Sequence, residues 1–281
     1  MSTGSGRVSA AEPIRLGTGA ALVRHIAVVG LAGLVTGLAV GGVGSRLFMR
    51  ISAMAAGAAA QGATTEAGET VGAITSEGTM ALMIFVGIAS GIVGALFYAT
   101  FRPWLAWTGR FRGLAFGVVL FAVASATSDV LNPDNFDFSL LGNRALNVAL
   151  IVLLFLAFGL VMEGVFGMLD RRLPSTAGGR GKARVMYGAI TGLGVALAAL
   201  MMPQLLFSSG PCDCDPPIIA SWFVVIAAAG TLVRWASEIR AGSVRSLAVA
   251  RALGWSGLVG ACLFGLWRAG SDAVAILTAS Q

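Results

Sequence analysis

The sequence predicts an all-α integral membrane bundle of about seven transmembrane helices, and three observations support this prediction. Of the 281 residues, 57% are hydrophobic and 11% are charged, whereas a soluble domain is about 45–50% apolar and about 25% charged. The mean hydropathy of the chain is +0.85. Seven segments are apolar over the roughly 20 residues that a helix needs to cross about 30 Å of hydrocarbon.

The predicted spans form a single polytopic membrane domain over residues 19–281, and residues 1–18, rich in Ser, Gly and Thr, form a mobile cytoplasmic tail. The last span is the weakest because Arg268 interrupts it. A six-helix bundle, with this segment lying in the interface, is the alternative. The predicted spans are residues 26–44, 78–100, 113–131, 146–168, 185–208, 218–236 and 252–271.

The first span is an apolar run of 19 residues, longer than the roughly 7–15 residues of a signal-peptide core, so we expect an uncleaved helix. Gly33, Gly37 and Gly41 form a stripe of small residues on one face of it, and Gly87 and Gly91 are similarly spaced in the second span. Small residues let helices approach closely in lipid. The glycines therefore predict packing within the bundle or, alternatively, an interface with a homo-oligomer or a partner subunit.

Two arginines follow the first span directly. Arg46 and Arg50 are four residues apart and so share one helical face. They predict either an extension of the first helix or a helix lying on the membrane surface. In either case they would form ion pairs with external acids or bind an anionic headgroup or solute.

Single carboxylates near the ends of the third and fourth spans are the main candidates for a transport or ion-pair site. Glu163 is the acid placed deepest in the membrane, and Asp129 lies close to the opposite end of its own span. A lone carboxylate in a membrane must face protein or water, or be protonated. For Glu163 the sequence suggests Arg234, Arg24 or His25 as partners, in either a proton or cation relay or a helix-packing ion pair.

The turn between the fifth and sixth spans contains Cys212 and Cys214 between prolines. Two thiolates next to carboxylates are weak candidates for a thiophilic metal such as Cu(I). A disulfide or free thiols are the alternatives. The acidic turn after Asp129 lacks the EF-hand spacing, and its Asn-Pro and Asp-Asn pairs are ordinary turn chemistry.

The distribution of charge predicts the orientation. Loops rich in Arg or Lys stay in the cytoplasm, and alternate loops of this chain hold 15 of its 19 basic residues, while the opposite set holds nine of the 13 acids. We therefore expect a multi-pass protein of the cell membrane with a cytoplasmic N-terminus and, with seven spans, an external C-terminus. The net charge of +6 then comes from arginines in the predicted cytoplasmic loops, where they can contact the lipid bilayer. It does not indicate nucleic-acid binding.

The composition excludes several chemistries. A single His cannot build a bis-histidine haem or a multi-histidine metal site, and the only Lys, Lys182, lies in a predicted loop where it cannot hold retinal. The chain has no P-loop and no H-E-x-x-H pair. We expect no cofactor, and the sequence leans against an enzyme.

Short motifs in about the first 170 residues carry a resemblance. Residues Gly44–Arg50, the pair Gly78-Thr79 after a Thr/Glu/Gly-rich stretch, and the turn Asn132–Asp137 are similar to features of uncharacterised multi-pass membrane proteins of high-G+C Gram-positive bacteria. The resemblance implies a membrane location and no activity.

The sequence leads to two main hypotheses of function. The first is a small-solute or ion transporter or channel, or a subunit of one, because glycine-rich helices are combined with charged groups near both interfaces. The alternative is a non-catalytic scaffold or accessory subunit of a membrane complex that docks through the glycines of the first span. An enzyme acting on lipid has the least support, because no nucleophile–base pair is evident.

Overall fold

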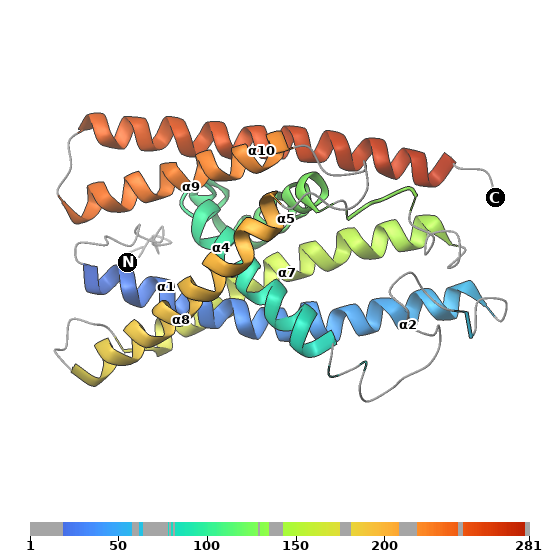
Figure 1. Cartoon of the computed structure of the whole chain (residues 1–281), viewed down its shortest axis with the longest axis horizontal. Helices are drawn as coiled ribbons and strands as arrows, with labels where there is room; N and C mark the ends of the chain where they lie inside the picture. Colours follow the sequence, from blue (N-terminus) through green and yellow to red (C-terminus); the bar gives the residue numbers. More distant parts are fainter. Residues whose placement is uncertain are drawn as a thin grey trace, which may run out of the picture.

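A computed structural model of the chain describes residues 19–57, 62–63, 78, 80, 82–128, 130–134, 143–174, 181–207, 218–240 and 244–278. The described part is all-helical and has no strand (Figure 1). The predicted tail, Asp129, Cys212 and Cys214 lie outside the described residues. The helices are α1 (Gly19–Thr36), η1 (Gly37–Gly44), α2 (Ser45–Ala56), η3 (Leu82–Ile88), α4 (Ala89–Phe101), η4 (Ala106–Phe111), α5 (Arg112–Thr127), α7 (Arg144–Arg172), α8 (Gly181–Phe207), α9 (Ile218–Ile239) and α10 (Val244–Thr278).

Six helical segments of the described chain are long and apolar enough to cross a membrane, and they include the segment that the sequence marks as weakest. That segment belongs to α10, a single helix of 35 residues. The remaining predicted span, the fifth, corresponds to α8, which has 27 residues and a shorter apolar stretch at Val185–Leu197. The chain is therefore a polytopic helical bundle of the membrane type.

The first helix extends well beyond its predicted span at both ends. Segments α1, η1 and α2 form one continuous helix of 38 residues, Gly19–Ala56. Hydropathy marks only its apolar middle, because α2 carries Arg46 and Arg50. Of the two alternatives for these arginines, the structure has the extension of the first helix.

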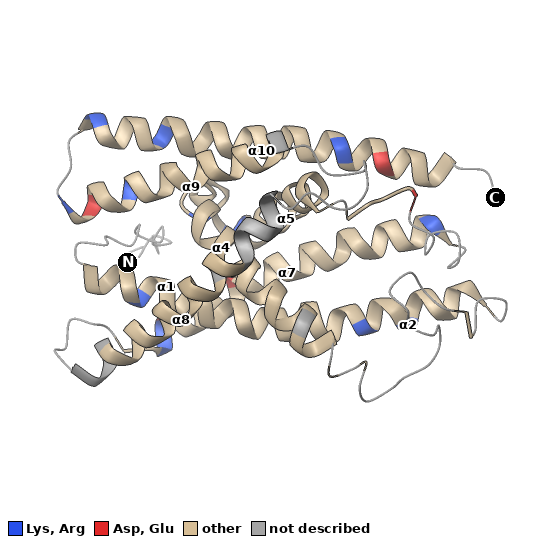
Figure 2. Cartoon of the chain, in the orientation of Figure 1, with Lys and Arg blue, Asp and Glu red and all other residues tan. Residues whose placement is uncertain are grey.

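Helices α1 to α2, α7, α9 and α10 run along an elongated bundle, and α4 and α8 cross it obliquely (Figure 1). We call the end with the start of α1, the end of α7 and the start of α10 the proximal end, and the end with α2, the start of α7 and the end of α10 the distal end. Helices α9 and α10 form a long antiparallel hairpin beside the others. Figure 2 shows that the charged residues of α10 lie toward its two ends, with an uncharged stretch between Arg251 and Arg268.

Glycines form the closest contacts between neighbouring helices. A Cβ added at Gly37 would overlap the Gly87 carbonyl oxygen and lie 2.5 Å from the Gly91 Cα. A Cβ at Gly33 would lie 2.5 Å from the Ala95 Cβ. Because Gly41 likewise faces Ser90, the small-residue stripe of the first span packs against η3 and α4 within the same chain. We call this contact the glycine seam.

Two other helix pairs also pack closely at glycines. Gly117 of α5 faces the backbone of Leu156, and a Cβ at Gly257 of α10 would lie 2.5 Å from the Ala227 nitrogen of α9. Such backbone-to-backbone contacts replace the hydrophobic effect as the source of helix packing in lipid.

The seam has an unusual backbone on both sides. Segments η1 and η3 are π-helical and lie against each other. In η1 the sequence Gly-Leu-Ala-Val-Gly-Gly-Val-Gly provides four glycines in eight residues, which lowers the helical preference of this stretch. Because π-helical turns occur frequently at functional sites, the glycine seam is a candidate functional region.

Candidate functional site

Glu163 on α7 has two hydrogen-bonding partners. The Tyr98 hydroxyl of α4 donates to its Oε2 at 2.5 Å, and Nη1 of Arg112, the first residue of α5, lies 3.3 Å from its Oε1. The side chains of Arg112 and Glu163 are 16% and 28% exposed. The carboxylate therefore has both an ionic partner and a neutral donor, which satisfies the requirement for a charge placed in a membrane helix.

Arg102, just after α4, completes this group. Its Nε donates to the Tyr98 oxygen at 2.9 Å, and its guanidinium carbon lies 4.3 Å from the centre of the Phe166 ring. We call Tyr98, Arg102, Arg112 and Glu163 the proximal network. It joins the ends of α4, α5 and α7 through alternating donors and acceptors, and its central Tyr98 is fully buried.

The partners that the sequence suggests for Glu163 are wrong. Arg234 bonds to Glu238 one turn along α9, at 2.9 Å. Arg24 pairs with Asp170 at 2.6 Å, and His25 packs edge-on against Phe166 with ring centres 5.6 Å apart. The reason is that α7 packs closely on α5, and so Arg112 reaches the carboxylate.

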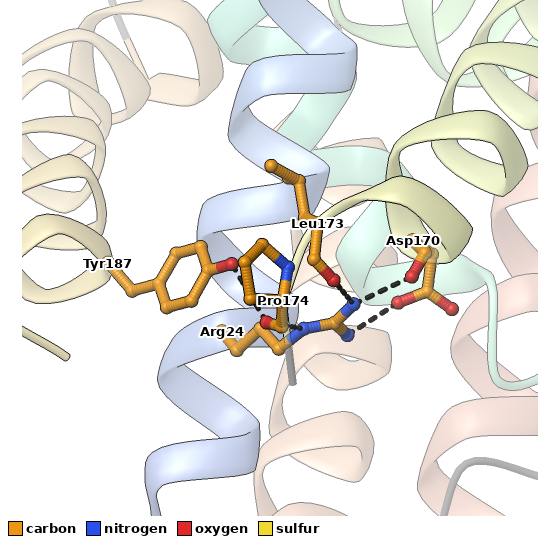
Figure 3. Close-up of polar contacts among 5 residues, drawn as sticks. All are labelled: Arg24, Asp170, Leu173, Pro174 and Tyr187. Atoms are coloured by element: carbon orange, nitrogen blue, oxygen red, sulfur yellow. Dashed lines mark hydrogen bonds and ion pairs between the residues drawn. The ribbon is translucent and has the colours of Figure 1, made fainter. Parts of the chain in front are cut away.

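Arg24 makes a second polar group at the proximal end (Figure 3). Its Nη1 donates to the Asp170 carboxylate at 2.6 Å, and its Nη2 donates to the Asp170 carbonyl at 2.7 Å. The same guanidinium donates to the carbonyls of Leu173 and Pro174, each at 3.1 Å. The last carbonyls of a helix have no partner within the helix, and a cation there also favours the helix dipole. Arg24 therefore caps the end of α7 from a different helix.

Helix α8 is also hydrogen-bonded to the end of α7. The Tyr187 hydroxyl donates to the Pro174 carbonyl at 3.0 Å (Figure 3). The Thr191 hydroxyl donates to the Val23 carbonyl of α1 at 2.9 Å. We call the contacts of Arg24 and Tyr187 with the end of α7 the α7 clamp. It fixes α1, α7 and α8 to one another.

A cavity of about 230 Å³ lies on the distal side of these two groups, beside the glycine seam. Its wall comes from η1, α2, η3, α4, α5 and α7 and is almost entirely apolar. Glu163 is not part of the wall. The lining residues are Val40, Gly41, Ser45, Val86, Ser90, Val93, Gly94, Phe97, Leu120, Ala124, Thr127, Ser128, Leu154, Phe155 and Phe158.

The chemistry of this wall limits what the cavity can hold. The cavity is half-open, and an ion that moves into its apolar part must exchange its water shell for charged or polar groups. The wall has no charged residue, and its hydroxyls come from Ser45, Ser90, Thr127 and Ser128. The cavity therefore suits an apolar molecule or the apolar part of an amphiphile.

Two further polar contacts lie toward the distal end. The Ser52 hydroxyl of α2 donates to Oδ1 of Asn147 on α7 at 2.7 Å, and both side chains are buried. On α10, Arg268 lies 3.6 Å from Asp272. The sequence does not point to Ser52 and Asn147, because single hydroxyl and amide side chains within apolar helices carry no recognisable motif.

Across the described residues, no group of three or more His, Cys, Asp or Glu side chains is arranged to hold a metal ion. No protein family, curated protein or solved structure matches this chain. The glycines Gly33, Gly37 and Gly41 are covered by η3 and α4, so the scaffold hypothesis loses the docking face on which it was based.

Proposed function

We propose that this polytopic membrane protein moves a small, mostly apolar solute, which occupies the cavity beside the glycine seam. The carrying observation is the position of the cavity next to η1 and η3, the two π-helical segments that face each other. Cavities between bundle helices are usual sites for small molecules. The apolar wall favours an apolar solute over an ion. Of solute transport and ion transport, we therefore propose solute transport.

The seam offers a way to change the cavity. Shear motions slide packed helices past one another by small distances. The glycines of the seam have no side chains of their own, and the side chains of Leu38 and Met83 lie against Gly87 and Gly42. A slide of η1 along η3 therefore meets fewer steric barriers than a slide between helices that carry large side chains on both contacting faces. Because η1 and η3 both line the cavity, such a slide changes its shape.

The proximal network gives this movement a fixed base. Its hydrogen bonds and ion pair join α4, α5 and α7 to one another at the proximal end. In the proposed mechanism Glu163 and Arg112 keep the proximal end closed while the distal half moves. Glu163→Gln then loosens the network and alters the rate of transport without filling the cavity.

We also propose that the proximal end faces the cytoplasm of the cell, with the C-terminus outside. The arginines whose side chains the structure describes support this: ten lie toward the proximal end and four toward the distal end, and loops rich in Arg stay in the cytoplasm. The proximal cations are Arg24, Arg102, Arg110, Arg112, Arg171, Arg172, Arg234, Arg240, Arg245 and Arg251, and the distal ones are Arg46, Arg50, Arg144 and Arg268. Membrane-impermeant thiol labelling of Arg172→Cys and Asp134→Cys in intact cells, in a variant without native cysteines, tests this orientation.

Flux into proteoliposomes tests the function. The solute panel contains indole, benzoate, octanol and octanoate, with rubidium as the ion, and empty liposomes give the passive background. We expect protein-dependent flux of at least one organic solute and none of rubidium. Ala124→Phe, which projects a ring into the cavity, should abolish that flux, while Leu193→Phe on an exposed position of α8 should not. Flux of rubidium alone, or of nothing in the panel, contradicts the proposal.

A further inference from the structure

The cavity has the depth of one membrane leaflet. Along α5 its lining residues run from Leu120 to Ser128, a rise of eight residues, or about 12 Å at roughly 1.5 Å per residue. Half of the hydrocarbon core is about 15 Å. The cavity is therefore long enough for a chain that lies parallel to the lipid tails.

Three of its four hydroxyl residues lie at one end, and the fourth, Ser90, lies along the wall between Val86 and Gly94, where its hydroxyl donates to the Gly87 carbonyl at 3.2 Å. Phe97 and Phe158 line the end nearer the middle of the bundle, while Ser45, Thr127 and Ser128 line the distal end. The Thr127 hydroxyl donates to the Val123 carbonyl at 2.9 Å and lies 3.5 Å from the Ser128 hydroxyl. We call Ser45, Thr127 and Ser128 the hydroxyl rim. An amphiphile fits this gradient with its chain inward and its head at the rim.

The volume restricts the number of chains. A cavity of about 150 Å³ lined by apolar side chains holds one benzene molecule, and this cavity measures about 230 Å³. It accommodates one chain of medium length and excludes the two chains of a phospholipid. Phe158 closes the inner end, because its ring lies directly against Gly94 and leaves no space for a Cβ there.

We infer that the distal cavity is a binding site for a single acyl chain of a free fatty-acid-type amphiphile, whose head lies at the hydroxyl rim. The inference deepens the proposed function, on which its role as transported solute rests. It names the substrate class through three independent features: depth, volume and the one-sided hydroxyls. Binding itself needs no transport, so the two can fail separately.

Quenching of a tryptophan placed in the wall tests the site. Phe155 lines the cavity and is partly buried, so Phe155→Trp in nanodiscs reports a bromine atom inside it, after subtraction of the emission of the otherwise identical protein with Phe155. We expect saturable quenching by terminally brominated decanoate and its reversal by decanoate. Adding Ala124→Phe or Val93→Phe should weaken the apparent affinity about tenfold, and adding Leu193→Phe should leave it unchanged.

Comparison ligands distinguish a free fatty acid from a bilayer lipid as the source of the bound acyl chain. Brominated decane, which has no head, should bind about tenfold more weakly than brominated decanoate if the hydroxyl rim contributes. Saturating quenching by a brominated phospholipid that decanoate cannot reverse overturns the inference in favour of a lipid tail. Equal quenching in the filled variants also overturns it. Decanoate binding without flux of any solute refutes the proposed transport and leaves the site standing, whereas flux of indole without decanoate binding refutes the site alone.

Discussion

The contacts of the α7 clamp predict that Arg24 contributes more to the stability of the bundle than its ion pair with Asp170 alone would contribute. Arg24→Gln removes one contact with the Asp170 carboxylate and three with carbonyls, those of Asp170, Leu173 and Pro174. Interhelical hydrogen bonds in membranes contribute about 0.6 kcal/mol each, and a partly exposed ion pair about 1 kcal/mol or less. The expected loss in the free energy of unfolding is therefore about 2–3 kcal/mol for Arg24→Gln.

Asp170→Asn is the matched comparison. It neutralises the carboxylate and leaves the three carbonyl contacts of Arg24 in place, so the expected loss is about 1 kcal/mol or less. Arg24→Lys should fall between the two, because an ammonium is a point donor and cannot reach acceptors on several sides at once. In a double-mutant cycle, Arg24→Gln should remove most of the effect of Asp170→Asn.

Unfolding in mixed micelles with increasing dodecyl sulfate measures these losses. The thiol of Cys262, partly buried in α10, reports unfolding in a variant in which the other two cysteines are serine. If Arg24→Gln and Asp170→Asn lose equal stability, the carbonyl contacts contribute nothing, and the capping argument is refuted. If neither variant loses stability, the α7 clamp does not hold the bundle together at all.

Three more predictions use the same measurement. Gly37→Leu should lose about 3 kcal/mol through overpacking of the glycine seam, whereas Gly30→Leu, where a Cβ meets nothing within 4 Å, should be near neutral; equal losses would contradict the seam. Trp104→Phe deletes the 2.9 Å bond to the Thr231 hydroxyl and should lose about 1 kcal/mol, and an unchanged midpoint would mean that this bond adds nothing. Ser52→Ala should lose about 1–2 kcal/mol by leaving the buried Oδ1 of Asn147 without its donor, and adding Asn147→Leu should restore part of it. No recovery would show that packing, rather than the polar pair, matters there.

The fold was largely predictable because hydropathy records which segments lie in lipid. It places a helix in each of the seven predicted segments, including the one interrupted by Arg268. Hydropathy did not predict the full length of the first helix, because Arg46 and Arg50 lower the hydropathy of α2 below that of a membrane span. Hydropathy measures burial in lipid, and a helix that continues past the lipid gives no such signal.

The site was less predictable because a sequence does not say which helices are neighbours. Glu163 could be singled out as an intramembrane carboxylate, but depth along each helix was the only guide to its partner, and depth did not distinguish Arg112 from Arg234. The cavity gave no signal at all. Its wall of Val, Phe, Leu and Ala side chains has the same composition as a surface that faces lipid.

The two halves of the bundle differ in what would resist a movement. At the proximal end, sliding α7 along α1 or α5 breaks directional bonds at Arg24, Tyr98 and Arg112, and each broken bond leaves a charge or a carbonyl without a partner. At the glycine seam the contacts are between backbone atoms and side chains such as Ser90 and Ala95 that lie against the glycines, and no charged group takes part in them. Motion is therefore expected where the side-chain interlock is weakest, which is also where η1 and η3 border the cavity. In the proposed mechanism an amphiphile enters or leaves the cavity as η1 slides along η3, so occupancy and movement are coupled through the same wall.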